Sequence, residues 1–144
     1  MIEKRKLTKA ELNQLIKDAP DVETRNLKKI LAYCHDVDAY DFFHAVSIDQ
    51  SGIVNGRPIY FGAVSYNPNK KRHELWTIVN HNVKEQFSLY RISKKTAKMW
   101  AKKYGIIYAT MEKEVEKNLK WVEKMGFIPI EETKYFVTFA LKGD

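Results

Sequence analysis

Apolar residues near the start of the chain recur at helical spacing in two short segments. Thr8 and Glu11 have the spacing of a capping box, and apolar residues then repeat every three or four positions. Ala19-Pro20-Asp21 interrupts this pattern, because proline and the residue before it disfavour a continuing helix. The pattern returns from Thr24 to Tyr33. The sequence therefore predicts two N-terminal helices.

The pattern then changes to one typical of strands. Phe42 to Ile48 is rich in aromatic and β-branched residues and is predicted to form a strand that ends at Asp49–Gly52. Asn55-Gly56 suits a tight hairpin turn, because both central positions of such a turn need a positive φ. The predicted strands that follow are Ile53-Val54 and Pro58–Ser65 on either side of that turn, and Glu74–Val79. We therefore expect these segments to form consecutive antiparallel strands.

Helical periodicity resumes at Gln86 and lasts to Tyr104, where Gly105 is suited to end the helix. A short apolar strand, Ile106–Ala109, follows, and a strand–helix–strand connection of this kind is right-handed with parallel strands. The remaining predicted elements are a helix over Glu114–Met125 and strands over Phe127–Ile130 and Tyr135–Leu141. The predicted fold class is α/β in the α+β sense, with a mostly antiparallel mixed sheet, one parallel pair and two packed helices. We expect one domain over 1–144, with N-terminal helices in 1–41 and a core in 42–144.

Charge and composition narrow the class of partner. The chain has 25 Lys and Arg against 18 Asp and Glu, a net charge of +7 and a pI near 9.4. Such a charge favours binding to an acidic protein, a nucleic acid or a phosphate-bearing cofactor. Many basic surfaces, however, serve only to keep a protein soluble. No apolar run is long enough to span a bilayer, so no membrane partner is expected. Cys34 is the only cysteine, which excludes an intrachain disulfide and favours a cytoplasmic protein.

The segment Lys117–Phe127 carries a family resemblance. A basic amphipathic helix that ends in Gly126-Phe127 and leads into a strand, preceded by three strands, a long helix and a short strand, resembles the GNAT (Gcn5-related N-acetyltransferase) family. The resemblance covers about the last hundred residues and implies acetyl-CoA-dependent transfer of an acetyl group to an amine. A narrower similarity is to small GNAT-like proteins of short-tailed phages, some of them internal virion or assembly proteins. That similarity implies a location in the host cytoplasm or the virion, and a virion partner.

The resemblance also implies where a site would lie. Acetyl-CoA would lie along Trp76, Thr77, Ile78 and Val79 and over Lys84 and Ser88, and Glu74 would accept the proton of the amine. The sequence departs from the family pattern in the phosphate-binding loop. Phe87 and Leu89 stand where small residues are expected, and no glycine lies between Gly62 and Gly105. The customary Tyr that protonates the leaving thiolate is replaced by Val122.

Two hypotheses of function follow. The first is an N-acetyltransferase, and the alternative is a non-catalytic GNAT-fold protein for virion assembly or host interaction that has lost acetyl-CoA binding. The glycine-free loop favours the second hypothesis.

Other polar residues give weaker signals. His81 lies in the loop as a possible substrate contact, although a lone loop histidine is more often simply exposed. Cys34-His35-Asp36 matches no zinc or calcium spacing, so no metal site is predicted. One face of the long helix gathers cations that would bind nucleic acid or an acidic partner, a function less favoured than that of a solvated face. These cations are Arg91, Lys94, Lys95, Lys98 and Lys102.

Overall fold

A computed structural model describes residues 2–144 and gives seven strands and five helices in this part of the chain. The elements are β1 (Glu3–Arg5), α1 (Lys9–Asp18), α2 (Asp21–Tyr33), α3 (Ala39–Val46), β2 (Ser47–Val54), β3 (Pro58–Asn67), β4 (Arg72–Val79), α4 (Gln86–Tyr104), β5 (Ile106–Glu112), α5 (Glu116–Lys124), β6 (Ile128–Glu132) and β7 (Phe136–Lys142). The strand order in the sheet is β1-β2-β3-β4-β5-β7-β6.

The chain divides into two compact units. The first unit contains the residues up to Ser65 together with Trp76–Leu89, and the second contains Tyr66–Leu75 and Tyr90–Asp144. Strand β4 therefore contributes its first half to the second unit and its second half to the first.

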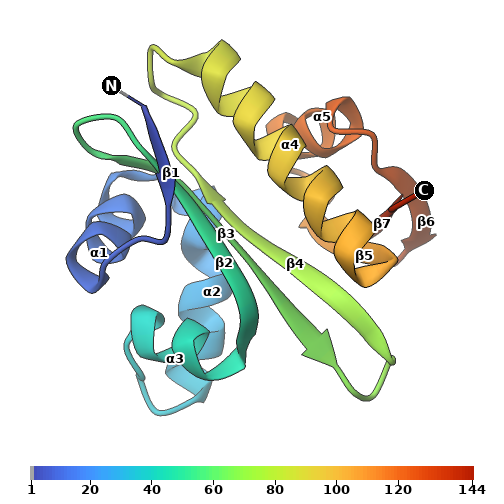
Figure 1. The fold of residues 1–144 in the computed structure, drawn as a ribbon. Helices are drawn as coiled ribbons and strands as arrows, with labels where there is room; N and C mark the ends of the chain where they lie inside the picture. The colour runs from blue at the N-terminus through green and yellow to red at the C-terminus, as the bar shows by residue number, and fades with distance from the viewer. Residues whose placement is uncertain (1) are drawn as a thin grey trace. The chain divides into compact units, whose positions relative to one another are not determined.

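The first unit packs three helices against an antiparallel ladder. Figure 1 shows α1, α2 and α3 gathered beside β1, β2 and β3. The buried core draws on all of these helices and on the strands, and Phe43 of α3 meets Phe61 of β3 with ring centroids 4.7 Å apart. The other core residues include Leu7, Leu12, Leu15, Leu27, Val54 and Ile78. This core fixes the strand end that carries the predicted cofactor residues.

The predicted capping box forms at the start of α1. The hydroxyl of Thr8 accepts from the Glu11 N–H at 3.2 Å, and a Glu11 carboxylate oxygen accepts from the Thr8 N–H at 2.9 Å. Arg5 donates to both carboxylate oxygens of Glu11, at 2.8 and 2.7 Å. The hydrogen bond from Arg5 lowers the pKa of Glu11 to about 2. The start of α1 is thus tied to β1.

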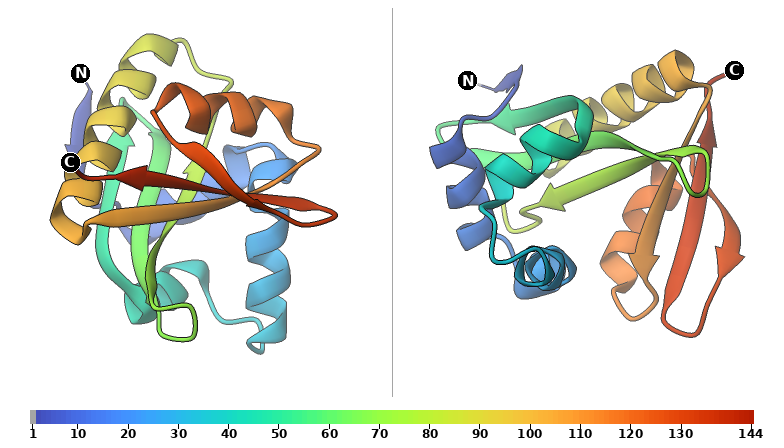
Figure 2. Two further views of the ribbon diagram at one scale, coloured as in Figure 1. Left: turned by 90° about the vertical axis from the view of Figure 1, so that its right-hand side faces the viewer. Right: turned by 90° about the horizontal axis from the view of Figure 1, so that it is seen from below.

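The second unit contains the rest of the sheet and the two C-terminal helices. Strands β4 and β5 pair in parallel through His73–Ile107 and Glu74–Tyr108, and β7 pairs antiparallel with both β5 and β6. The two helices lie next to each other in Figure 2, and the Tyr90 hydroxyl on α4 donates to the carbonyl of Lys124 at the end of α5. The parallel pair confirms the predicted parallel arrangement of these two strands.

Several predicted elements are confirmed at residue level. Helix α4 spans Gln86–Tyr104 as predicted, and Gly105 follows it with φ +88°. The predicted turn at Asn55-Gly56 does join β2 to β3, but only Gly56 of this pair has a positive φ, at +74°, so the predicted primed turn with two positive-φ residues does not form. No helix among residues 2–144 has the length and apolar content to cross a bilayer.

The predicted strand over Phe42–Ile48 is wrong for residues 42–46, and only its last two residues lie in a strand, β2. Residues 39–46 form α3, because Asp38 caps the helix by accepting from the N–H groups of Tyr40 at 2.9 Å and Asp41 at 3.4 Å. The aromatic residues that suggested a strand instead give this helix a face that packs on the core, where Phe43 is 1% exposed. Tertiary packing outweighs the weak β propensity of aromatic residues.

The predicted strand end at Asp49–Gly52 is also wrong, because β2 continues through it from Ser47 to Val54. Gly52 pairs with Phe61, and a Cβ at Gly52 would collide with the Leu7 side chain. The glycine therefore permits close packing within a strand. The strand β1, which pairs with β2 through Lys4–Ile53, was not predicted.

Candidate functional site

The end of β4 and the loop that follows it are held by backbone and amide hydrogen bonds. The N–H of Asn80 donates to the carbonyl of Ile59 at 3.0 Å, so contact with β3 continues one residue past the end of β4. The side-chain oxygen of Asn80 then accepts from the N–H of Asn82 at 3.1 Å. This side-chain bond turns the chain without a glycine.

Gln86 closes the other end of the loop. Its side-chain amide donates to the carbonyls of His81 and Val83, the latter at 3.1 Å. The first backbone bond of α4 joins the N–H of Leu89 to the carbonyl of Glu85 at 2.8 Å. The loop thus has a defined shape although it contains no glycine, and it ends at a helix N-terminus, where the first N–H groups have no partner within the helix.

A buried carboxylate and a buried imidazole meet at this strand end. Glu23, in the first turn of α2, has a side chain that is only 3% exposed. One of its oxygens accepts from the backbone N–H of Val79 at 3.1 Å, and the other lies 3.9 Å from Nε2 of His81. The His81 side chain is 6% exposed. Two groups able to exchange protons are therefore withdrawn from water beside the end of β4.

Glu23 was missed by sequence reasoning. An acid in the first turn of a helix is common, because it complements the helix dipole, so Glu23 gave no signal. His81 was considered and was expected to be exposed as a lone loop histidine. That expectation is wrong, since the residue is 8% exposed as a whole.

The side chains of the predicted cofactor-binding residues on β4 pack toward the core. Ile78 and Val79 are almost completely buried, and Thr77 is half-buried. The Trp76 indole donates to the Ser65 hydroxyl at 2.8 Å, and its ring meets Phe43 edge-on at 5.6 Å. A ligand along this strand would therefore rely on backbone groups.

The residues at the start of α4 differ sharply in exposure. Lys84 is exposed and Ser88 is half-buried. Phe87 is 75% exposed, whereas Leu89 is completely buried in the core. One bulky side chain thus projects into solvent and the other into the core, which leaves the N–H groups at the head of α4 and the Lys84 ammonium as groups suited to an anion. These groups fit the phosphates of a coenzyme A thioester.

Glu74, the predicted base, lies in the second unit. It accepts from Nε of Arg72 at 3.1 Å and from the amide of Asn67 at 3.2 Å. Arg72 also donates to Glu131 at 2.9 Å and stacks over the Tyr108 ring at 4.7 Å. Burial lowers the pKa of Arg72. Its hydrogen bonds to Glu131 and Glu74 raise the pKa by more than burial lowers it, so the net shift is upward. The carboxylate of Glu74 is held in a structural network.

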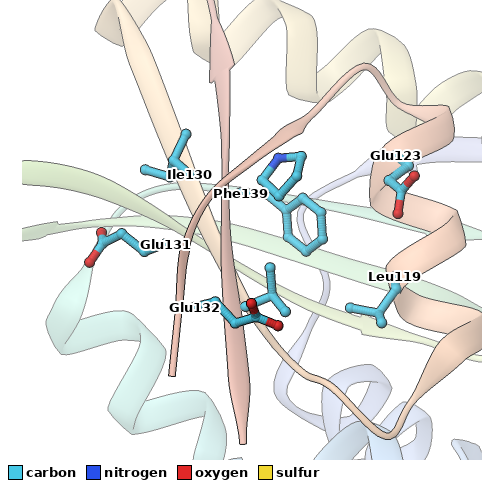
Figure 3. Close-up of a pocket in the computed structure, with 8 residues that line it drawn as sticks. Leu119, Glu123, Ile130, Glu131, Glu132 and Phe139 are labelled. Atoms are coloured by element: carbon cyan, nitrogen blue, oxygen red, sulfur yellow. The ribbon is translucent and has the colours of Figure 1, made fainter. Parts of the chain in front are cut away.

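A pocket of about 450 Å³ in the second unit contains none of the predicted site residues. It lies between α5 and the β6–β7 hairpin, and Figure 3 shows Leu119 and Glu123 on the helix facing Phe139. Two of its carboxylates are already paired, Glu131 with Arg72 at 2.9 Å and Glu132 with Lys113 at 2.8 Å. Among residues 2–144 no group of three or more His, Cys, Asp or Glu side chains is arranged to hold a metal ion.

Comparison with solved structures identifies the fold. The chain superposes on PaiA N-acetyltransferase from Thermoplasma acidophilum, solved with coenzyme A, with a TM-score of 0.68 and 16% identity over 99% of both chains. It superposes on PH1933 from Pyrococcus horikoshii with a TM-score of 0.72 and 13% identity, covering 100% of this chain and 99% of the other. The fold is that of the GNAT acetyltransferases.

A third GNAT-fold structure also matches over the full length. It is the N-acetyltransferase PseH from Campylobacter jejuni with acetyl-CoA, at a TM-score of 0.60 and 18% identity over 100% of both chains. No family profile and no curated protein sequence matches the chain. The GNAT resemblance of the last hundred residues thus extends to the whole chain at the level of fold.

Proposed function

We propose that the protein transfers an acyl group from a coenzyme A thioester to a primary amine. The observation that carries this proposal is the buried pair of Glu23 and His81 beside the backbone N–H of Val79. A proton acceptor is needed where the amine attacks, and a carboxylate withdrawn from water next to an imidazole is suited to that task.

The GNAT fold supports the choice of acyl donor, since the solved relatives include complexes with coenzyme A and acetyl-CoA. In this chain the donor would lie along Trp76–Val79 with its phosphates at Lys84, Ser88 and the head of α4. All of these residues belong to the first unit, as do Glu23 and His81. The proposed site therefore needs no group from the second unit.

The chemistry assigned to Glu23 is proton acceptance. The nitrogen lone pair of a neutral amine attacks the thioester carbonyl carbon, a C–N bond forms, and the C–S bond breaks to release the coenzyme A thiolate. The surplus proton on nitrogen passes to Glu23, directly or through water, and from there to the thiolate. The products are an amide and the coenzyme A thiol. Glu74 remains the alternative base from the sequence, but its two hydrogen-bond donors, Arg72 and Asn67, favour a structural role.

A second candidate function is supported by a different observation. The Val79 N–H already has Glu23 as its partner, and the loop that follows has no glycine. Both features suit a non-catalytic GNAT-fold protein that acts through protein contacts, such as a phage virion or assembly component. This candidate predicts no affinity for coenzyme A.

Calorimetric titration and thermal denaturation with coenzyme A test the two candidates. Ligand at about a hundredfold excess over its dissociation constant stabilises the folded state by about 2.7 kcal/mol. We expect a clear rise in melting temperature, followed by thiol release from acetyl-CoA in the presence of primary amines. No shift at millimolar coenzyme A would overturn the acyltransferase proposal. Binding without thiol release across peptide and small-molecule amines would leave a coenzyme A binding protein and remove the catalytic role of Glu23.

A further inference from the structure

Helix α4 is the one helix of this structure whose residues include no acid. Its 19 residues carry six cations, whereas α1, α2, α3 and α5 each contain Asp or Glu. The six cations are Arg91, Lys94, Lys95, Lys98, Lys102 and Lys103. A solvated surface does not require a single sign of charge, because helices of mixed charge are equally soluble.

Four of these cations form one narrow row, which we call the cationic ridge. At about 100° per residue, Arg91, Lys95, Lys98 and Lys102 fall within an arc of about 60°. The arc is centred opposite Ser93, Ala97 and Trp100, which are buried. All four ridge residues are exposed. The ridge therefore projects directly away from the core of the second unit.

Repulsion among the ridge cations destabilises the free protein. Cations three or four residues apart on a helix repel each other. Within residues 2–144 none of the four ridge side chains forms an ion pair, so no ion pair in this part of the chain offsets that repulsion. A polyanion bound along the ridge would offset it.

We propose that the cationic ridge binds the phosphate backbone of nucleic acid without reading base sequence. Successive ridge residues are three or four positions apart, which corresponds to steps of about 4.5 to 6 Å along the helix axis and a row about 16 Å long. Long flexible cations in a row suit a linear array of phosphates, and a helix fits within the major groove of a duplex. The four ridge side chains are cations, which contact phosphate oxygens at any base sequence, so we expect recognition to be electrostatic.

Other anionic partners fit this surface less well. The apolar face of α4 is already buried in the core, so the helix has no side that inserts into a membrane. A protein interface draws its affinity from a few buried aromatic or apolar anchors. The large apolar side chains that α4 exposes are Phe87, in its first turn, and Met99, and neither belongs to the ridge itself. The inference does not depend on acyl transfer.

Fluorescence anisotropy with labelled DNA tests the proposal. The full chain is titrated into a duplex and a single strand of mixed sequence at 50 to 200 mM salt. With four phosphate contacts, the slope of log K against log salt for the duplex is about −3.6, which is a loss of about 150-fold over this range. Affinity for a second, unrelated sequence is expected to agree within about twofold.

Charge reversal on the ridge provides the decisive comparison. Lys95→Glu with Lys98→Glu should reduce duplex affinity by at least a hundredfold and lower the salt slope by about two. Lys29→Glu with Lys70→Glu changes the net charge equally at two exposed positions off the ridge and should leave most of the affinity. The ridge variant gains favourable pairs with Arg91 and Lys102, so its melting temperature should not fall.

Several results would overturn the proposal. Equal losses in the two double variants would show that net charge alone is responsible. Competition by polyglutamate as effective as that by DNA, or tighter binding to phosphatidylserine vesicles than to DNA, would assign the ridge to an acidic protein or a lipid surface. Absence of binding at 50 mM salt would leave the ridge without this function.

Discussion

The carboxylate of Glu23 accepts a 3.1 Å hydrogen bond from the backbone N–H of Val79, although 56 positions separate the two residues in the chain. The first turn of α2 thereby reaches the end of β4. The same carboxylate lies 3.9 Å from His81, so one side chain links the strand end to the loop before α4. This link is the basis of the proposed proton transfer.

Replacing Glu23 by Gln should reduce acyl transfer strongly with little effect on the fold. The amide keeps an oxygen that can accept from Val79 but cannot take a proton from the amine. Loss of a general base reduces kcat by about 10²- to 10⁴-fold. The measurement is thiol release from acetyl-CoA under saturating amine, with circular dichroism as a check of folding.

Glu74→Gln is the matched control for that variant. Because Glu74 is held by Arg72 and Asn67, we expect a loss of stability and a change in kcat of only a few-fold. If Glu74→Gln abolishes turnover while Glu23→Gln does not, the catalytic base is the residue that the sequence alone predicted.

Lys84→Ala should weaken coenzyme A binding. The ammonium is exposed beside the head of α4, where it would make a charge-assisted hydrogen bond to a phosphate. Such a bond contributes about 1.5 to 3 kcal/mol, so the dissociation constant should rise at least about tenfold in a calorimetric titration. Lys70→Ala, at another exposed loop position, should leave the constant unchanged. A similar rise in both variants would point to long-range charge instead of direct contact.

The stabilisation from Glu11 should depend on pH in a defined direction. Its pKa is lowered to about 2 from an ordinary value of 4.5, chiefly by the hydrogen bond from Arg5. The ionised form therefore stabilises the folded state fully above pH 4.5, and this contribution is lost as pH falls toward 2. Because the pair is partly exposed to solvent, this contribution is small.

Urea denaturation of wild type and Glu11→Gln tests that direction. The difference in unfolding free energy should be largest at pH 7 and should shrink progressively below pH 4.5. Glu3→Gln, which removes the other acidic partner of Arg5 but no part of the cap, should give a smaller difference. A difference that grows toward low pH would contradict the assigned role.

Gly105→Ala should destabilise the end of α4 through the backbone alone. Gly105 has φ +88°, and a Cβ there would meet no atom within 4 Å. The cost is therefore that of a left-handed conformation, about 1 to 2 kcal/mol. Asn tolerates this region better than Ala, so Gly105→Asn should lose less stability in chemical denaturation. Equal losses for Ala and Asn would indicate that an unrecognised contact, and not φ, sets the cost.

Local patterns determined much of the second unit in advance. Helical periodicity predicts the bounds of α4, and the need for a positive φ predicts the glycine after it. Chain connectivity predicts the parallel crossover to β5. All three signals depend on neighbouring residues. The place of the turn between β2 and β3 follows in the same way from Asn55-Gly56, but its predicted type does not, since only Gly56 has a positive φ. The sequence also predicted the clustering of positive charge on α4, because the spacing of its cations places them on one face of a helix.

Long-range contacts decided the rest. Residues 42–46 have the composition of a strand, yet the Asp38 cap and the packing of Phe43 on Phe61 make them helical. Leu89 and Phe87 were expected to obstruct the loop, but their side chains lie in the core and in solvent respectively. The meeting of Glu23 with Val79 and His81 has no local signal, because hydrogen bonds between distant segments depend on how the helices pack on the sheet. Sequence periodicity therefore determined most of the secondary structure and the cationic ridge, and only the tertiary structure brought the candidate catalytic groups together.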